Sequence, residues 1–226
     1  MISIVVASRS NLEQFRSKSL LYQSLSFLPR GKFKLHLYPE NTAGLPAVYN
    51  HAVSKLAASG CGGPVVFLHD DVLLPDYFWI EHLCDGLEKF EVVGVAGNVS
   101  RVAGQPGWAF KSDKFDWDTK NNLSGAVAHG SAWPAPISWY GPPRRRVKLL
   151  DGVLLASKLS TLITNNLFFD ERFQFHFYDL DFCRSAEKAG LSCGTWDVPL
   201  VHASGGSFNS TTWRDAYSIY LNKWGS

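Results

Sequence analysis

The sequence predicts an α/β fold in which helices cover a mainly parallel β-sheet. Over residues 1–97, short apolar runs typical of strands alternate with segments of helical periodicity, and the connections between them are short. This alternation is typical of parallel sheets with right-handed crossovers. The run 64–68 is apolar without interruption, as expected for a strand buried on both faces.

Composition narrows the class of protein. The chain has 226 residues, of which 46% are hydrophobic and 19% charged, and this is typical of a globular protein with a substantial core. The formal net charge is +2, so there is no electrostatic basis for expecting nucleic acid as a partner. The eight tryptophans exceed what a core of this size needs, and we expect some of them on a binding face.

Cysteine usage and hydropathy bear on location. The four cysteines are scattered without a CxxC pair, which favours reduced thiols over a zinc ribbon or a disulfide framework. The apolar start at 2–6 is too short for a signal peptide, and no run approaches about 18 apolar residues. We therefore expect a cytoplasmic location and no transmembrane segment. Peripheral membrane contact and oligomeric state stay open.

The first half of the chain is predicted element by element. Residues 33–37 alternate between apolar and polar side chains, and Trp79, Leu83, Leu87 and Phe90 repeat at helical spacing. We expect strands at 2–6, 33–37, 64–68 and 92–96, and helices from 12 to the turn at 29–31, from 47 to 59, and from Pro75 onward, where a proline suits the first helical turn.

The second half begins with a break in this rhythm. Residues 97–146 are rich in Gly, Pro, Trp and Asn, and we expect them to form a hairpin or another excursion over the site. The expected elements that follow are a strand at 148–155, a helix at 157–163, a helix from about 179 to Gly190, a strand pair at 192–196 and 198–201, and a helix at 210–224 docked on the domain.

The stretch that ends the buried run is His69-Asp70-Asp71. Ligands of open α/β sheets bind beyond the carboxyl ends of the strands. Two adjacent carboxylates repel each other and are costly to desolvate unless a divalent cation or hydrogen-bond donors neutralise them. The pair therefore favours a metal-and-phosphate site. The alternative is a turn pair that caps the following helix.

Five stretches of the chain form a recognisable series of motifs. They are Asn41-x-x-Gly44 with Tyr49-Asn50-His51-Ala52, then His69-Asp70-Asp71, Asp151-Gly152, Phe169 to Gly190, and Val201-His202. Together these motifs resemble those of family-2-type glycosyltransferases with the GT-A fold. His69-Asp70-Asp71 is similar to the Asp-x-Asp segment of that family, and the matches run in the same order along nearly the whole chain.

The resemblance implies a Rossmann-like three-layer sandwich with a mainly parallel central sheet and a small antiparallel excursion. It also implies one domain, 1–226, with a nucleotide-binding half at 1–97 and an acceptor-side half at 98–226 that includes the C-terminal helix. The implied activity is metal-dependent transfer of one sugar, with inversion, from a nucleotide-diphospho-sugar such as a UDP-sugar to a glycan or small-molecule acceptor.

Site residues follow from the same resemblance. Asp71 and His202 would hold Mn²⁺ or Mg²⁺, and an imidazole among the ligands favours Mn²⁺ somewhat. The residues expected at the nucleotide are Ala7, Ser8, Arg9, Glu40, Asn41, Asn50 and Asp70. Those expected at the donor or acceptor sugar are Asp151, Gly152, Asp181 and Trp139, and Trp108, Trp117, Trp133 and Tyr140 also suit stacking on sugar faces.

Asp179 is the expected catalytic base, because it matches the Asp of the family's Glu-Asp pair at a helix start. We expect the helix N-terminus to keep its carboxylate ionised. A plain helix cap is the alternative for Asp179, a strand-end turn for Asp151, and a hydrogen-bonded loop histidine for His202. The cluster Arg144-Arg145-Arg146 suits either a diphosphate or a solvated face.

The sequence also departs from the family pattern. A histidine, His69, stands at the first acidic position of the Asp-x-Asp segment, and Tyr178 stands at the Glu of the Glu-Asp pair. The Gln-x-x-Arg-Trp motif of processive synthases is absent. Two alternatives to a glycosyltransferase therefore stay open: a non-catalytic module that binds sugar nucleotides or glycans, and a nucleotidyltransferase of the same fold.

Overall fold

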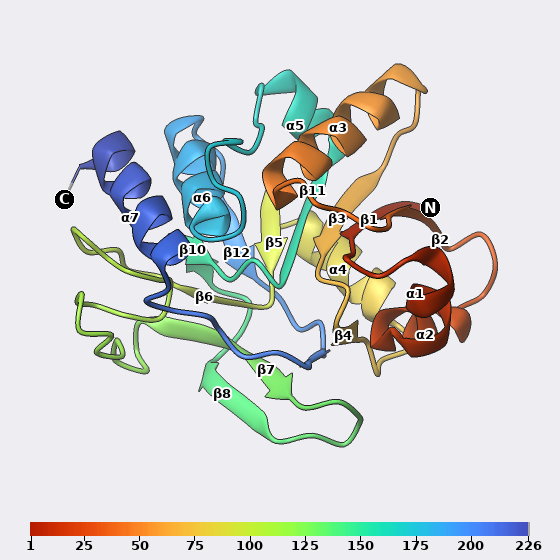
Figure 1. Cartoon of the computed structure of the whole chain (residues 1–226), viewed down its shortest axis with the longest axis horizontal. Coiled ribbons are helices and arrows are strands. Elements are labelled where there is room, and N and C mark those ends of the chain that lie inside the picture. The colour runs from red at the N-terminus through yellow and green to blue at the C-terminus, as the bar shows by residue number, and fades with distance from the viewer. Residues whose placement is uncertain (226) are drawn as a thin grey trace.

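A seven-stranded β-sheet forms the middle layer of the structure, a computed structural model that describes residues 1–225 (Figure 1). The strand order is β2-β1-β3-β11-β5-β12-β9. The strands β2, β1, β3, β5 and β12 run in one direction, while β11 and β9 are reversed, so the sheet is mainly parallel as predicted. Its strands are β1 (Ile2–Ala7), β2 (Phe33–Tyr38), β3 (Pro64–Leu68), β5 (Val92–Gly94), β9 (Arg146–Val147), β11 (Leu154–Lys158) and β12 (Cys193–Thr195).

Side chains of this sheet enter two separate cores, one on each face. In β3, Val65 and Phe67 join one core, whereas Val66 and Leu68 join the other. Successive side chains of a strand point to opposite faces, so an uninterrupted apolar run is what a doubly covered strand requires. The prediction for this segment is confirmed.

Helices cover both faces and complete the predicted three-layer sandwich. One core receives side chains from α3 (Leu45–Ala58), α5 (Leu159–Thr164), α6 (Tyr178–Lys188) and α7 (Thr211–Trp224). The other core receives side chains from α1 (Leu12–Lys18), α2 (Leu20–Ser26) and α4 (Trp79–Leu87).

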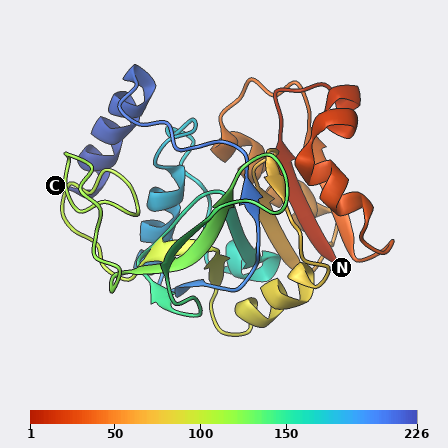
Figure 2. The same ribbon diagram turned by 90° about the horizontal axis from the view of Figure 1, so that it is seen from below.

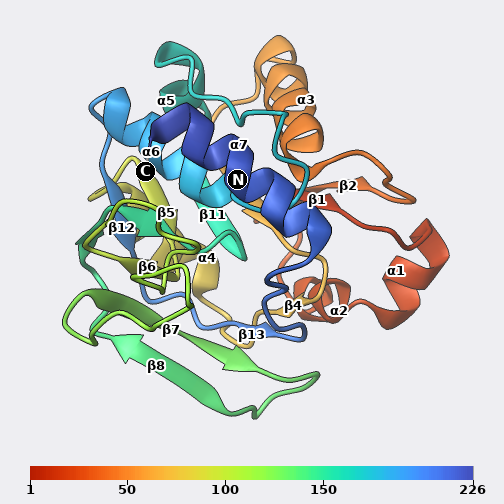
Figure 3. The same ribbon diagram turned by 60° about the vertical axis from the view of Figure 1, so that its left-hand side comes forward.

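A second, smaller sheet has the strand order β10-β6-β7-β13-β4, with β8 paired to β7. The strands β7 and β8 form an antiparallel hairpin that projects from the body of the molecule in Figures 1 and 3 and lies in front of it in the view from below (Figure 2). The predicted excursion over residues 97–146 is thereby confirmed. The strands of this sheet are β4 (Val72–Leu73), β6 (Ala96–Asn98), β7 (Leu123–His129), β8 (Ile137–Gly141), β10 (Leu149–Leu150) and β13 (Val201–His202).

Two predicted strands are wrong in their extent because the chain changes sheets within them. The segment 92–96 divides into β5 and β6, and the segment 148–155 divides into β10 and β11, with the turn at Asp151 and Gly152 between the latter two. The expected pair at 192–196 and 198–201 is also wrong, since β12 and β13 belong to different sheets.

Two predicted helices are also corrected. The helix expected from residue 12 to the turn at 29–31 is interrupted at Ser19, whose backbone is extended and whose side chain accepts a hydrogen bond from Tyr22 N. The Ser19 hydroxyl donates to the carbonyl of Asp70 at 2.9 Å, and this tie explains the break. The helix expected to start at Pro75 begins instead at Trp79.

The last helix, α7, docks beside α6 as predicted (Figure 3). Trp213 and Tyr220 are buried, and the ring of Phe177, the residue before α6, stacks on Tyr217 and packs against both of them. Phe177 has a φ of 65°, which is a strained conformation for a bulky side chain. The aromatic contacts from α7 hold this residue at the entry of α6.

No helix among residues 1–225 is long and apolar enough to cross a membrane. The division into a nucleotide-binding half and an acceptor-side half stays a prediction.

Candidate active site

The carboxyl ends of β1 and β3 bring Ser8 and Asp70 together. The strands are parallel neighbours, and the Ser8 hydroxyl donates a hydrogen bond to the Asp70 carboxylate. The loop after β2 joins the same edge, because Asn41 N donates to the carbonyl of Ser8 at 2.8 Å. Three strand ends therefore form one polar edge, as the sequence predicts for a ligand site in an α/β sheet.

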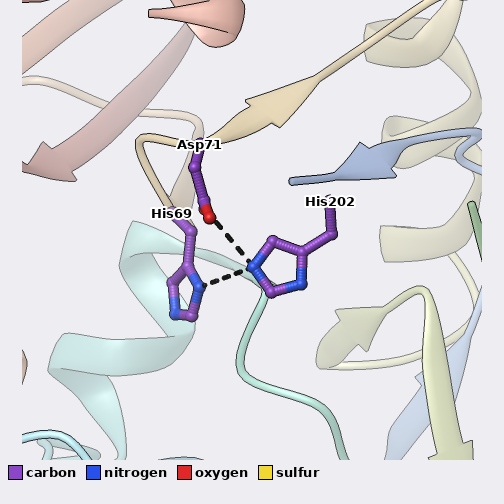
Figure 4. Close-up of side chains that lie close together, drawn as sticks. All are labelled: His69, Asp71 and His202. Atoms are coloured by element: carbon purple, nitrogen blue, oxygen red, sulfur yellow. Dashed lines mark hydrogen bonds and ion pairs between the residues drawn. The ribbon is translucent and has the colours of Figure 1, made fainter. Parts of the chain in front are cut away.

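Next to this edge, His69, Asp71 and His202 form a compact cluster (Figure 4). The backbone at the end of β3 turns into β4, and β4 pairs antiparallel with β13, which carries His202. His202 Nε2 lies 3.3 Å from Asp71 Oδ1 and 3.4 Å from His69 Nδ1. One donor atom from each residue lies within 4.8 Å of the others, so the three could share one metal ion.

The charges within the cluster are unequal. Burial would raise the pKa of Asp71, but hydrogen bonds from His202 and Ser204 lower it well below its usual range. Burial opposes the charged form of His202, yet the hydrogen bond to Asp71 and its charge raise the pKa of this histidine. Burial and then the charge of His202 lower the pKa of His69. Burial and the charge of His202 thus favour the neutral form of His69.

A chain of hydrogen bonds fixes His69 from behind. Its Nε2 lies 3.1 Å from the Tyr178 hydroxyl, which donates in turn to the carbonyl oxygen of Gly152 at 2.7 Å. Position 152 requires glycine, since a Cβ there would overlap the Tyr178 hydroxyl oxygen and lie 2.7 Å from Cζ of that ring. The Asp151-Gly152 turn therefore admits the tyrosine side chain.

Asp179 lies on the other side of the same turn. Its Oδ2 accepts a hydrogen bond from Gly152 N at 2.9 Å, and its Oδ1 accepts one from Leu180 N at 2.9 Å. Burial, followed by the charge of Asp151, raises the pKa of Asp179 to about 7. The expectation that the helix N-terminus keeps this carboxylate fully ionised is therefore wrong, because desolvation and a like charge outweigh the helix terminus.

Asp151 is held by Trp108. Trp108 Nε1 donates to Asp151 Oδ2 at 2.6 Å, while Val153 N donates to Asp151 Oδ1 at 2.8 Å. These contacts fix the carboxylate at the bend between the two sheets. Asp151 therefore lies in a strand-end turn, which is the alternative that the sequence left open for it. The same residue also lines the pocket.

These groups open on a pocket of about 360 Å³. His69, Asp151, Asp179 and His202 line its polar part. Its walls are largely aromatic, and the rings of Trp117 and Tyr140 stack with centroids 6.0 Å apart. The aromatic residues that line the pocket are Trp108, Phe110, Trp117, Tyr140, Phe175, Phe177, Tyr178, Phe208 and Trp213.

The residues predicted for the nucleotide fall into two groups. The end of β1 and the loops beside it hold Ala7, Ser8, Arg9, Glu40, Asn41 and Asp70, which lie near one another at the polar edge. Asn50 lies apart from them. Its amide donates to the carbonyl of Phe169 at 2.8 Å and its side-chain oxygen accepts from Phe169 N at 2.9 Å, so it ties α3 to the loop before α6.

Two residues predicted for the sugar are not brought to the pocket. Asp181 is fully buried and contacts Lys223 and the indole Nε1 of Trp224, both at 2.7 Å. Trp139 is 57% exposed and lies between Ser138 and Tyr140, which do line the pocket. Because side chains of a strand alternate, Trp139 points to the opposite face of the hairpin.

Two residues of the arginine cluster are engaged within the fold. Arg144 Nε donates to Asp197 Oδ2 at 2.6 Å, and its guanidinium lies 5.1 Å from the ring centroid of Trp196. Arg145 donates to the carbonyl of Asn121 at 2.9 Å. Arg144 therefore ties the segment before β9 to the chain that follows β12, and Arg145 ties it to the chain that precedes β7.

Several pocket residues escaped the sequence-based assignment, among them His69 and Tyr178. Both stand where the sequence departs from the glycosyltransferase pattern. The hydrogen bond between the two side chains explains why the two departures occur together. The sequence does contain a signal that could have identified them, because positions 69 and 178 both lack the acidic residue of the family pattern.

Comparisons with known proteins bear on the backbone alone. No family model and no curated protein sequence matches the chain. Similar solved structures include S. aureus TarS, with 14% identity and a TM-score of 0.49 over 91% of this chain, and TarS 1–349 in complex with UDP-GlcNAc, with 13% identity and a TM-score of 0.49 over 91%. A197 from STIV has 11% identity and a TM-score of 0.47 over 93%.

The chain spans only part of the TarS structures, 36% of the longer one and 59% of TarS 1–349 with UDP-GlcNAc, whereas it spans 98% of A197. Similarity at this level assigns no activity.

Proposed function

We propose that the chain is an inverting, metal-dependent glycosyltransferase that moves one sugar from a nucleotide-diphospho-sugar to a hydroxyl of a glycan or small-molecule acceptor. The observation that carries the proposal is the meeting of two kinds of group at one pocket. His69 and His202, two members of the cluster that could hold a metal ion, line this pocket. Asp179 also lines it, and its carboxylate has a pKa of about 7, which suits a general base.

The polar edge is the proposed nucleotide site. Ser8, Asp70 and the loop at Asn41 lie at the carboxyl ends of three parallel strands, where nucleotides bind in open α/β sheets. A UDP-sugar is the first donor to test. In this arrangement the diphosphate lies between the edge and the cluster, and the sugar enters the pocket.

The donor set of the cluster fits a divalent cation. Asp71 and His202 would hold Mn²⁺ or Mg²⁺, since a carboxylate oxygen and an imidazole nitrogen lie 3.3 Å apart and face each other. When bound, such a cation neutralises the negative charge that develops on a departing nucleoside diphosphate.

The proposed role of Asp179 is to accept the proton of the acceptor hydroxyl. As the acceptor oxygen forms its bond to the anomeric carbon, the bond from that carbon to the diphosphate oxygen breaks. The proton passes to Asp179, and the electron pair leaves with the nucleoside diphosphate. The backbone donors Gly152 N and Leu180 N orient the carboxylate, and each of its oxygens keeps a further acceptor site for the hydroxyl.

The aromatic walls suit the apolar faces of sugar rings. Trp117 and Tyr140 present stacked rings on one side of the pocket, and Phe175 lies near His69. Flat rings contact the C–H faces of a sugar while a few polar groups select its hydroxyls. Asp151 is the proposed partner for a sugar hydroxyl.

Calorimetry with a panel of UDP-, GDP- and dTDP-sugars in the presence of Mn²⁺, followed by assays of hydrolysis and transfer, tests the proposal. We expect one donor to bind and to be turned over, and we expect a chelator and Asp179→Asn each to abolish turnover. Turnover that survives both would refute the mechanism. Release of pyrophosphate from a nucleoside triphosphate would instead identify a nucleotidyltransferase.

A second candidate is a non-catalytic module that binds sugar nucleotides. Both oxygens of Asp179 already accept backbone hydrogen bonds, which is also what a structural cap does. Tight binding of a donor without turnover by any acceptor, and unchanged binding in Asp179→Asn, would support this candidate over the enzyme.

A further inference from the structure

We infer that His69 is a third metal-binding residue and that it makes the cluster a transition-metal site that discriminates against Mg²⁺. The inference deepens the proposed function, on which its role in the reaction rests, but metal binding is measurable without any substrate. It starts from the position of His69, which stands where the family pattern has an acidic residue.

The geometry of the donor atoms supports one shared ion. Two nitrogen or oxygen ligands, each about 2.1 Å from the same ion, can be at most about 4.2 Å apart. His202 Nε2 lies 3.4 Å from His69 Nδ1 and 3.3 Å from Asp71 Oδ1, within this limit, and the donor atoms of all three residues lie within 4.8 Å of one another. The rings of the two histidines and the carboxylate face a common point (Figure 4).

Hydrogen bonding assigns the tautomer that His69 needs. The single hydroxyl proton of Tyr178 is donated to the carbonyl oxygen of Gly152. The Tyr178 oxygen can therefore only accept from His69, so Nε2 carries the proton and Nδ1 keeps its lone pair. That lone pair is on the side of His202 and Asp71.

The orientation of the His69 ring is fixed from two sides. Tyr178 holds the Nε2 edge, and the ring of Phe175 stacks on the imidazole with centroids 6.0 Å apart at an interplanar angle of 26°. A hydrogen bond to the second ring nitrogen is the usual way in which proteins orient and activate a metal-binding histidine. Tyr178 is thus a positioning residue for His69.

The donor set decides the metal. Mg²⁺ prefers oxygen ligands in octahedral geometry and gives up water reluctantly, whereas imidazole suits first-row transition metals. Two imidazoles and one carboxylate therefore favour Mn²⁺, Co²⁺ and Zn²⁺, with affinity rising from Mn²⁺ to Co²⁺ as expected for nitrogen ligands. An aspartate at position 69 would restore an oxygen-rich site.

Calorimetry on the full chain with MgCl₂, MnCl₂, CoCl₂ and ZnCl₂, without nucleotide, tests the inference. We expect one Co²⁺ per chain, bound at least about tenfold more tightly than Mg²⁺. The visible absorption of bound Co²⁺ reports nitrogen and oxygen ligation independently. Equal affinity for Mg²⁺ and Co²⁺ would overturn the inference. Co²⁺ bound only at sites other than the cluster of His69, Asp71 and His202 would also overturn it.

Variants assign the effect to particular side chains. His69→Ala should weaken Co²⁺ binding about tenfold or more and leave Mg²⁺ binding little changed, while His69→Asp should narrow the difference between Mg²⁺ and Co²⁺. Tyr178→Phe should weaken Co²⁺ binding by about tenfold, since partners of metal-bound histidines typically contribute this much. Co²⁺ affinity within twofold of wild type in His69→Ala would exclude His69 as a ligand.

The matched control is His51→Ala, which removes an exposed histidine of α3 outside the pocket and should leave Co²⁺ binding unchanged. All variants keep the four cysteines, so thiol binding cancels in the comparison. A Co²⁺ site with no binding of any sugar nucleotide would refute the proposed function and leave this inference standing. Binding and turnover of a sugar nucleotide with Mg²⁺ alone would support the proposed function and refute the inference that the site discriminates against Mg²⁺.

Discussion

The side chains of His69 and Tyr178 are hydrogen-bonded, with Nε2 of the histidine 3.1 Å from the tyrosine hydroxyl. They are two positions at which the sequence departs from the acidic residues of the glycosyltransferase pattern. A tyrosine that donates to the carbonyl of Gly152 can only accept from His69, and this leaves Nδ1 of the histidine free toward Asp71 and His202. The two replacements therefore act as one unit.

Replacement of Gly152 by alanine should disturb this unit. A Cβ at position 152 would lie 2.7 Å from Tyr178 Cζ and 3.1 Å from Asp179 Cβ, so the tyrosine must move. We expect the free energy of unfolding to fall by about 2 kcal/mol, as for other overpacked sites. Urea denaturation measures the change.

The control for this variant is Gly62→Ala, because a Cβ at position 62 meets nothing within 4 Å. Its free energy of unfolding should stay within about 0.5 kcal/mol of wild type. Equal unfolding curves for Gly152→Ala and Gly62→Ala would show that the turn at Asp151 and Gly152 can relax without cost.

The rate of sugar transfer should depend on the ionisation of Asp179. A general base acts as the carboxylate, and burial raises the pKa of Asp179 to about 7. The rate should therefore rise tenfold per pH unit well below pH 7 and level off above it. In Asp179→Asn the turnover rate should fall by about 10²–10⁴-fold, and the rise of the rate with pH should disappear.

Asp215→Asn is the control, since Asp215 is exposed on α7 and away from the pocket. It should keep the wild-type profile. A rate that is flat between pH 5 and pH 8 in the wild-type chain would argue that another group, or no group, accepts the proton.

The sequence was informative about positions that follow from strand ends. Apolar runs located the strands, and the polar residues after them proved to be neighbours in space, as for Ser8 and Asp70. Asp71 and His202 are far apart in the sequence, and the resemblance to a family predicted their proximity. The position of these residues depends on the order of the strands in the fold. The hydrophobic periodicity and the order of the motifs along the chain can predict that order.

Other parts of the site depend on tertiary contacts that local patterns do not encode. The hairpin β7–β8 could have presented either set of alternating side chains to the pocket, and the register placed Tyr140 inside and Trp139 outside. The pKa of Asp179 likewise depends on burial and on Asp151, whereas a helix N-terminus alone suggested the opposite direction. The role of His69 required knowledge of Tyr178.

The ion cluster under α7 should be important for stability. Lys223 Nζ lies 2.8 Å from Asp170 Oδ2 and 2.7 Å from Asp181 Oδ1, and Asp181 is fully buried. Lys223→Met keeps most of the side-chain volume but leaves the buried Asp181 without its cation, while Asp170 keeps its ion pair with Arg172. We expect the free energy of unfolding at pH 7 to fall by about 3 kcal/mol in urea titrations.

The loss in Lys223→Met should shrink in acid. Burial raises the pKa of Asp181 even beside Lys223, and a group with a raised pKa in the folded state favours folding more as pH falls. Lys188→Met, which removes an exposed charge on α6, is the matched control and should change little at either pH. A loss as large at pH 5 as at pH 7 would contradict the role assigned to the unpaired carboxylate of Asp181.

Ligand binding should distinguish the two faces of the β8 strand. Tyr140 lines the pocket and stacks on Trp117 with centroids 6.0 Å apart, whereas Trp139 on the same strand is 57% exposed and faces away. Tyr140→Ala should weaken binding of a sugar nucleotide by about 1 kcal/mol, which is roughly fivefold in Kd, because an aromatic contact is lost. Trp139→Ala removes a larger ring one residue away and should leave Kd unchanged in the same calorimetric titration. If Trp139→Ala weakened binding more than Tyr140→Ala did, the ligand would have to lie on the outer face of the hairpin, and the pocket would not be the sugar site.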